Sequence, residues 1–203
     1  MIPPPRKVGI AKAFSDSARK TLVAQPTAAE NLLEAYGITK NLTDDELALQ
    51  LVLRFATDIG FFAPALAFAK AWTGHAYLFH FNEPNPWEGP WKGEATHILD
   101  VAFLFQNFNA FLSDPQIRVA TDFATNVFHF VTTGKPLWPA FKTEEPGAYV
   151  FGPSKESTTE FVANYNSGIA EEGSGRKPTI LQLGDSIGLD ELAAVWGNFL
   201  TGQ

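Results

Sequence analysis

An aromatic run in the first half of the chain is the feature that most constrains the fold. Residues 75–82 read His-Ala-Tyr-Leu-Phe-His-Phe-Asn and lie between Gly74 and Pro84. A short, nearly continuous apolar run bounded by breaker residues predicts a strand that is largely buried. Such a strand needs covering layers, and the segments on either side of it have helical signals. The sequence therefore predicts a layered α/β fold.

Helix-start signals on both sides of this run support that prediction. Capping boxes at residues 27–30 and 43–46 predict two helices, the first ending at Gly37 and the second near Thr57-Asp58. The triplet that begins at Ser113 supplies a cap and a first-turn proline for a long helix running to about Gly134. Four apolar residues are expected on the inner face of this helix: Phe123, Val127, Phe130 and Val131.

The rest of the chain is expected to complete one α/β domain spanning residues 1–203. Short strands are predicted at residues 148–151 and 179–183, and a last helix at residues 189–200. Residues 1–26 show little pattern and are expected to be irregular. The Ser/Gly/Glu-rich residues 152–177 predict an excursion on the surface.

Composition excludes several classes of function. With 45% hydrophobic residues and 18 Phe, the chain can bury a sizeable core. A formal net charge of -7 without basic runs argues against nucleic acid or an anionic membrane as partner. We expect no membrane span and no signal peptide, hence a cytoplasmic protein as written. The absence of Cys excludes disulfides, thiolate metal sites and a cysteine nucleophile.

A long loop after the aromatic run is the first candidate for a functional site. Residues 83–96 hold three Pro, two Gly and two Trp, and His97 closes the loop. This is more punctuation than a simple connector needs, and loops that leave strand ends commonly carry functional residues. A histidine there can both accept and donate a proton near neutral pH.

The order of segments around this loop is specific. A strand ending in Phe81-Asn82 is followed by the Trp-containing loop, then Gly93, His97, and Asp100 three residues later, before an aromatic helix start at residues 103–105. This order resembles the catalytic-histidine region of type-B carboxylesterases, the family that includes cholinesterases and fungal lipases. Residues 57–62, 134–141 and 196–200 resemble further segments of that family.

The resemblance implies roles for individual residues. His97 would be the general base and acid of a serine-hydrolase triad acting on a carboxylic ester. Asp100 is expected to cap or orient the helix that starts there. His75, His80 and His129 have no companions at metal-ligand spacing and are expected to be structural. No metal or cofactor is implied.

The other members of the triad are the main departure from the family pattern. Family members are longer, and their nucleophile elbow and triad acid precede the histidine. The resemblance thus implies a partial α/β-hydrolase fold that keeps the C-terminal strands and helices and lacks the N-terminal half. Glu30, Asp44, Asp45 and Glu46 are better explained as helix-start acids than as the triad acid.

One segment does match the nucleophile motif. Gly184-Asp-Ser-Ile-Gly188 fits Gly-x-Ser-x-Gly between a predicted strand and a predicted helix, which would make Ser186 a nucleophile. Its position after His97 reverses the order of α/β-hydrolases, and a turn with a capping role is the simpler interpretation.

Four hypotheses follow for the function. The chain is a truncated esterase portion that is inactive alone, or it complements a separate chain that bears the nucleophile. Alternatively, it is a self-contained esterase that uses Ser186 with His97, or a binding module without enzymatic activity.

Overall fold

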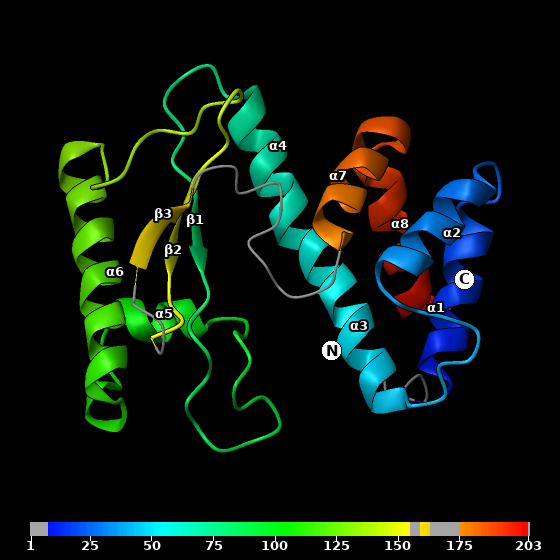
Figure 1. Ribbon diagram of the computed structural model, residues 1–203, viewed down its shortest axis with the longest axis horizontal. Helices are drawn as coiled ribbons and strands as arrows, with labels where there is room; N and C mark the ends of the chain where they lie inside the picture. The colour runs from blue at the N-terminus through cyan, green and yellow to red at the C-terminus, as the bar shows by residue number, and fades with distance from the viewer. Residues whose placement is uncertain (1–7, 155–158, 163–174, 203) are drawn as a thin grey trace. The chain divides into compact units, whose positions relative to one another are not determined.

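The computed structural model of the chain describes residues 8–154, 159–162 and 175–202 (Figure 1). The chain divides into two compact units. Unit 1 comprises Met1–Phe68 and Asn166–Gln203, and unit 2 comprises Ala69–Tyr165. Each unit has its own hydrophobic core, so we describe them separately.

Unit 1 is helical within the described residues. Its α-helices include α1 (Ile10–Thr21), α2 (Pro26–Ala35), α3 (Asp45–Thr57), α7 (Arg176–Ile187) and α8 (Leu189–Thr201). The ring of Phe14 on α1 meets Phe55 of α3 and Phe199 of α8 edge-on, with centroid distances of 5.2 and 5.5 Å. Helices far apart in sequence therefore share one aromatic core.

Helix α1 corrects the expectation that residues 1–26 are irregular. Ile10, Phe14 and Ala18 recur every four residues and are buried, as one face of a helix requires. Small residues such as Ala11 and Ser15 complete the buried face. Because small and weakly polar side chains contribute little to a hydrophobic pattern, the stripe is hard to recognise in the sequence. Residues 1–7 lie outside the described residues.

The helix that begins with α3 runs further than predicted. Asp44 caps it by accepting hydrogen bonds from the amides of Glu46 and Leu47, as the second capping box predicted. The predicted end near Thr57-Asp58 is wrong, because a π-helical segment, Asp58–Phe62, leads directly into α4 (Ala63–Ala71). Asp58 is tolerated inside this helix because it is paired there, as described below.

The continuous helix Asp45–Ala71 has the length and composition of a membrane-crossing helix, and we expected no such segment. A third of its most apolar window is nevertheless buried within the protein. Val52 and Phe55 are fully buried in the core of unit 1. Length and apolar composition are shared by core helices and membrane spans, so they do not separate the two classes.

Unit 2 combines a small sheet with helices. Strands β1 (Phe79–Phe81), β2 (Ala148–Phe151) and β3 (Thr159–Val162) form a sheet in the order β1-β2-β3. The pair β1–β2 is parallel, with His80 opposite Val150, and β2–β3 is antiparallel. Helix α6 (Asp114–Thr133) lies along this sheet (Figure 1), where Phe123 contacts Phe79, Phe81 and Phe151.

Two short helices complete the described part of unit 2. These are α5 (Leu99–Leu104) and the 3-10 helix Asn109–Phe111. Leu99 and Phe103 of α5 are buried in the same core as Phe123 and Phe151. Helix α5 is therefore fixed to the sheet by packing, which also restricts the position of the residues directly before Leu99.

Several predictions for unit 2 are confirmed. Strand β2 occupies the predicted residues, and α6 begins with a capping box between Ser113 and Gln116 and ends at Gly134 in the left-handed conformation.

Other predictions for unit 2 are only partly met. The aromatic run forms a strand over only three residues, and Phe79 is 46% exposed. On α6, Phe123 is buried, but Phe130 and Val131 are exposed, contrary to prediction.

The region from residue 152 to 183 differs most from expectation. The predicted strand 179–183 is wrong, because these residues belong to α7, where Ile180 and Leu183 are buried at helical spacing. The predicted surface excursion falls largely on residues 155–158 and 163–174, which lie outside the described residues. Within it, residues 159–162 form β3, and Arg176 and Lys177 are buried at the start of α7.

Candidate active site

The loop that carries His97 leaves the carboxyl end of β1 and is anchored at its root. The amide of Asn82 donates to the carbonyl of Phe151, which extends the pairing of β1 with β2 by one residue. The next residue, Glu83, is fully buried, and its carboxylate accepts hydrogen bonds from the amide and the hydroxyl of Ser154, both at 2.7 Å. The loop therefore starts from a fixed point.

The body of the loop is closed by main-chain hydrogen bonds. The amide of Asn85 donates to the carbonyl of Glu94 at 2.9 Å, and the amide of Gly93 donates to the carbonyl of Asn85 at 2.8 Å. The Asn85 side chain accepts a further bond from the amide of Trp87. The Trp87 ring packs edge-on against Phe108, 5.3 Å between centroids. The loop is therefore ordered by its own hydrogen bonds and by the packing of Trp87.

His97 is exposed in a turn directly before α5. The amide of Leu99 donates to the carbonyl of Thr96 across this turn, and Ile98 adopts a left-handed conformation with φ of 69°. Because Leu99 is buried, the turn holds the histidine at the surface end of a packed helix. Asp100 lies in the first turn of α5, where an acidic side chain interacts favourably with the helix dipole, but Ile98 occupies the cap position.

The other three histidines lie at distinct places in unit 2. His75 is exposed on the segment before β1, and its ring contacts Tyr77. His80 is part of β1. His129 lies near the end of α6, with Nδ1 at 2.6 Å from the carbonyl oxygen of Lys135. Among the described residues, no group of three or more His, Asp or Glu side chains is arranged to hold a metal ion.

The nucleophile motif around Ser186 does not have the expected structure. A nucleophile elbow is a sharp turn between a strand and a helix, whereas Gly184, Asp185 and Ser186 all lie within helix α7. The Ser186 hydroxyl donates to the carbonyl of Leu183 at 3.1 Å, a bond back to the preceding turn of the helix. The strand predicted at residues 179–183 is helical, so the segment forms neither a nucleophile elbow nor the strand-to-helix turn that was the simpler interpretation.

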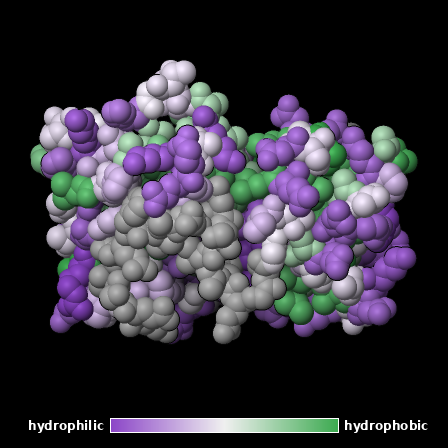
Figure 2. Space-filling model, turned by 45° about the horizontal axis from the view of Figure 1, so that its top comes forward, coloured by the Kyte–Doolittle hydropathy of each residue, from purple (hydrophilic) through white to green (hydrophobic). Residues whose placement is uncertain are grey.

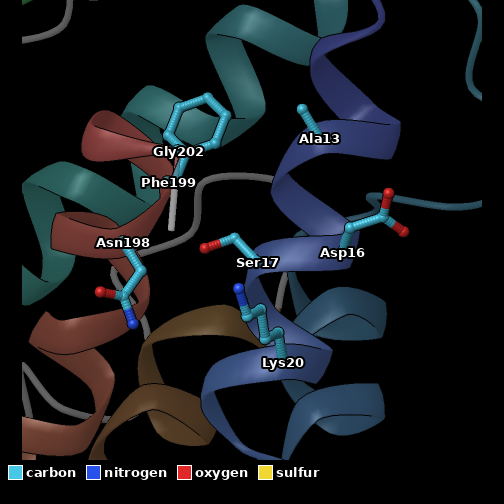
Figure 3. Close-up of a pocket in the computed structure, with 7 residues that line it drawn as sticks. All are labelled: Ala13, Asp16, Ser17, Lys20, Asn198, Phe199 and Gly202. Atoms are coloured by element: carbon cyan, nitrogen blue, oxygen red, sulfur yellow. The ribbon is translucent and has the colours of Figure 1, made fainter.

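A hollow of about 230 Å³ lies between α1 and α8 in unit 1 (Figure 3). It is lined by Ala13, Asp16, Ser17, Lys20, Asn198, Phe199 and Gly202. The Ser17 hydroxyl donates to the carbonyl of Val195, and the Asn198 amide donates to the Thr21 hydroxyl. Asp16 pairs with Lys12 on the outside of α1. These polar groups connect two helices or face solvent, so the hollow does not assemble a reactive site.

Large apolar side chains remain exposed on unit 2. They are most numerous on and around α5 and α6, and include Ile98, Phe105, Phe108, Phe111, Phe128 and Val131. On the face shown in Figure 2, apolar and polar residues are interspersed.

Comparison with known proteins identifies the class. A sequence model of the carboxylesterase family matches residues 7–167, which include the loop and His97. The chain therefore belongs to the carboxylesterase family. The family implies the α/β-hydrolase fold, with which a small, partly parallel sheet flanked by helices is compatible as part of that fold. No curated protein matches the chain.

The match confirms the resemblance deduced from the sequence and shifts its limits. The match begins at residue 7, well before the first resembling segment at residues 57–62, and it ends at residue 167, so the segment at residues 196–200 lies outside it. Helix α1, which the sequence prediction missed, therefore lies within the family match. The family also supports an ester-hydrolase type of chemistry.

Proposed function

We propose that this chain contributes the histidine to carboxylic-ester hydrolysis, with His97 as general base and acid. The position of His97 carries the proposal. It is exposed at the end of an ordered loop that leaves the carboxyl end of a strand in parallel pairing. In α/β sheets with parallel strands, sites form outside the carboxyl ends of the strands.

In this mechanism the His97 imidazole acts twice in each half-reaction, first as a general base and then as a general acid. His97 would accept the proton of a serine hydroxyl as the serine oxygen attacks the ester carbonyl, and it would then donate that proton to the departing alcohol. The same cycle repeats with water, which releases the acid and regenerates the serine. An exposed histidine is suited to this role, because its ring must reach a nucleophile on another segment.

We further propose that the nucleophile and the triad acid are carried by polypeptide other than these 203 residues, so that the chain alone is inactive. The chain would then represent the C-terminal strands and helices of an α/β-hydrolase. The only Gly-x-Ser-x-Gly sequence, at residues 184–188, lies within a helix and its end instead of on an elbow. The missing half would be encoded upstream, or supplied by a separate complementing chain.

The exposed apolar side chains of unit 2 are a second argument that another polypeptide segment packs on this unit. Phe105, Phe111 and Phe128 are 65%, 72% and 70% exposed. Leaving several large aromatic side chains in water is unfavourable, and exposed apolar clusters usually mark interaction sites. A nucleophile-bearing half that packs on unit 2 would bury them and complete the site beside His97.

The first experiment uses the purified chain with a fluorophosphonate probe and a p-nitrophenyl ester. We expect neither covalent labelling nor hydrolysis above background. Labelling that disappears in Ser186→Ala would overturn the proposed need for another segment and identify a self-contained esterase.

The second experiment uses the active form, either a longer translation product with an upstream Gly-Glu-Ser-x-Gly or the two-chain complex. His97→Ala should lower kcat by at least roughly 10⁴-fold, as loss of a triad member does. His75→Ala, which changes an exposed histidine before β1, is the matched control and should retain activity. If His97→Ala retains full activity, the proposed role of His97 is wrong.

A further inference from the structure

A buried carboxylate at the root of the His97 loop is not explained by the proposed chemistry. Glu83 has no exposed surface, although glutamate is among the residues least often buried. None of the ion pairs within the described residues includes Glu83. Asp58, the other acid that is buried among the described residues, has Arg176 as its partner.

Both carboxylate oxygens of Glu83 are held by one residue. Oε2 accepts from the amide of Ser154, and Oε1 accepts from its hydroxyl, each at 2.7 Å. These bonds span 71 residues of sequence and join the start of the loop to the segment that follows β2. A two-point contact fixes both the distance and the orientation between the two segments.

Gly152 permits this close approach. Its φ is +86°, and a Cβ at this position would lie 2.7 Å from Glu83 Oε2 and 2.8 Å from the Glu83 amide nitrogen and Cα. The main chain after β2 therefore packs directly against the main chain of Glu83. A larger residue would separate the two segments and lengthen the contact to Ser154.

Hydrogen bonds within the loop connect the fixed position of Glu83 to the segment that carries His97. Two residues after Glu83, Asn85 pairs with the main chain of Gly93 and Glu94, which closes the loop on itself. Only Ala95 and Thr96 separate Glu94 from His97. On the other side, α5 is held by Leu99 in the core. His97 thus lies between two anchors, one at Glu83 and one in α5.

We propose that Glu83 is a positioning residue for His97. Its carboxylate, bound by Ser154, fixes the root of the 83–97 loop and so aims the imidazole; this inference rests on the proposed function of His97. Catalysis by a general base depends on placement within a fraction of an ångström, so a remote anchor of this kind affects the rate without touching substrate.

The test needs a readout that does not depend on activity. We would label the histidines of the full chain with ¹⁵N and record the imidazole signals by NMR, assigning that of His97 by its loss in His97→Ala. In the same samples, amide exchange at Asn85 and Gly93 reports whether the loop is closed. Glu83→Ala should move the His97 signal toward that of an unstructured peptide and speed exchange at both amides at least tenfold.

Three variants make the comparison specific. Glu94→Ala changes an exposed acid on the same loop, leaves the main-chain bonds intact and should behave as wild type. Glu83→Gln should retain the wild-type His97 signal, because its amide can accept from the Ser154 amide and donate to the hydroxyl oxygen. Ser154→Ala loses only the hydroxyl bond and should give an intermediate result; it carries the test if Glu83→Ala does not fold.

The outcomes separate this inference from the proposed function. A folded Glu83→Ala whose His97 signal and amide exchange match those of Glu94→Ala would overturn the positioning role, as would a Glu83→Gln variant that behaves like Glu83→Ala. In the active form, Glu83→Ala should lower kcat up to roughly 10²-fold with little change in KM. If His97→Ala has no effect on activity while the NMR results hold, the proposed function fails and the anchor stands.

Discussion

Replacing Arg176 with methionine should destabilise unit 1 far more than the loss of a surface charge would. Asp58 and Arg176 are 2% and 7% exposed, and the Arg176 Nε donates to Asp58 Oδ2 at 2.9 Å. The Tyr36 hydroxyl donates to the same oxygen, also at 2.9 Å. In Arg176→Met, the Asp58 carboxylate stays buried and keeps the neutral Tyr36 hydroxyl as a donor, but it loses the cation that pairs with it.

The magnitude follows from the burial of both partners. Removing one member of a buried ion pair costs about 3–5 kcal/mol, since the remaining charge is left desolvated. Replacing both members with apolar residues removes that penalty and is commonly close to neutral. The double variant Asp58→Leu/Arg176→Met should therefore cost less than either single variant. A surface pair such as Lys12–Asp16, with side chains 83% and 59% exposed, provides the control and should contribute less than about 1 kcal/mol.

Trp196 offers a local probe for this measurement. Of the five tryptophans, it is the only one within the sequence ranges of unit 1. Urea unfolding of 5-fluorotryptophan-labelled protein, followed by the ¹⁹F signal of Trp196, gives the midpoint and slope for that unit. If the double variant loses as much stability as the two single variants added together, Asp58 and Arg176 are not coupled and the reasoning fails.

Three further changes test other parts of the structure. Burial, with help from the Asp58 carboxylate, raises the pKa of Tyr36 above its usual 10.0. The unfolded chain therefore releases this proton first, and stability should fall above pH 10 by up to about 1.4 kcal/mol per pH unit; urea titrations of Tyr36→Phe should show a flatter decline. Gly152→Ala should cost at least about 1 kcal/mol in thermal unfolding, because its left-handed backbone and contact with Glu83 exclude a Cβ. Phe14→Ala should cost about 3–5 kcal/mol in urea unfolding, since its ring is fully buried, and a smaller loss would mean that the core around α1 is loosely packed.

Elements with strong local signals were predictable from the sequence. Strand β2 is an apolar segment that lies where it was predicted, and α6 carries its own start signal at Ser113 and its own end signal at Gly134. These signals concern hydrogen bonds within a few residues of one another, so they do not depend on the rest of the fold. The exposure of Phe130 and Val131 was not predictable, because it depends on which neighbour covers the end of α6.

Elements defined by distant partners were predicted wrongly. The apolar stretch at residues 180–183 has the composition of a short strand. Its helical state agrees with the distant contacts at the start of α7, where Arg176 pairs with Asp58 and the Lys177 ammonium lies 5.3 Å from the centre of the Phe62 ring. Short apolar runs are compatible with either state, and tertiary contacts decide between them.

The candidate site likewise has one part that was predictable from local sequence and one part that depends on a distant contact. His97 could be singled out from the order of Trp, Gly and acidic residues around it, and the structure places it on an ordered loop beside a packed helix. The anchor at Glu83 could not be predicted, because its partner Ser154 is 71 residues away and neither residue belongs to a recognisable motif. A glutamate directly after an aromatic strand was the only available signal.

The helical state of the Ser186 segment explains why a sequence match alone could mislead about the nucleophile. The reactivity of an elbow serine depends on a strained turn that exposes its hydroxyl and places main-chain amides beside the developing oxyanion. Within α7, the amides point along the helix and the Ser186 hydroxyl is bonded to the carbonyl of Leu183. Activation of this serine would require the end of α7 to unwind. The loop that carries the proposed base, His97, is by contrast closed by its own main-chain hydrogen bonds. This difference favours the proposal that the nucleophile lies on another segment.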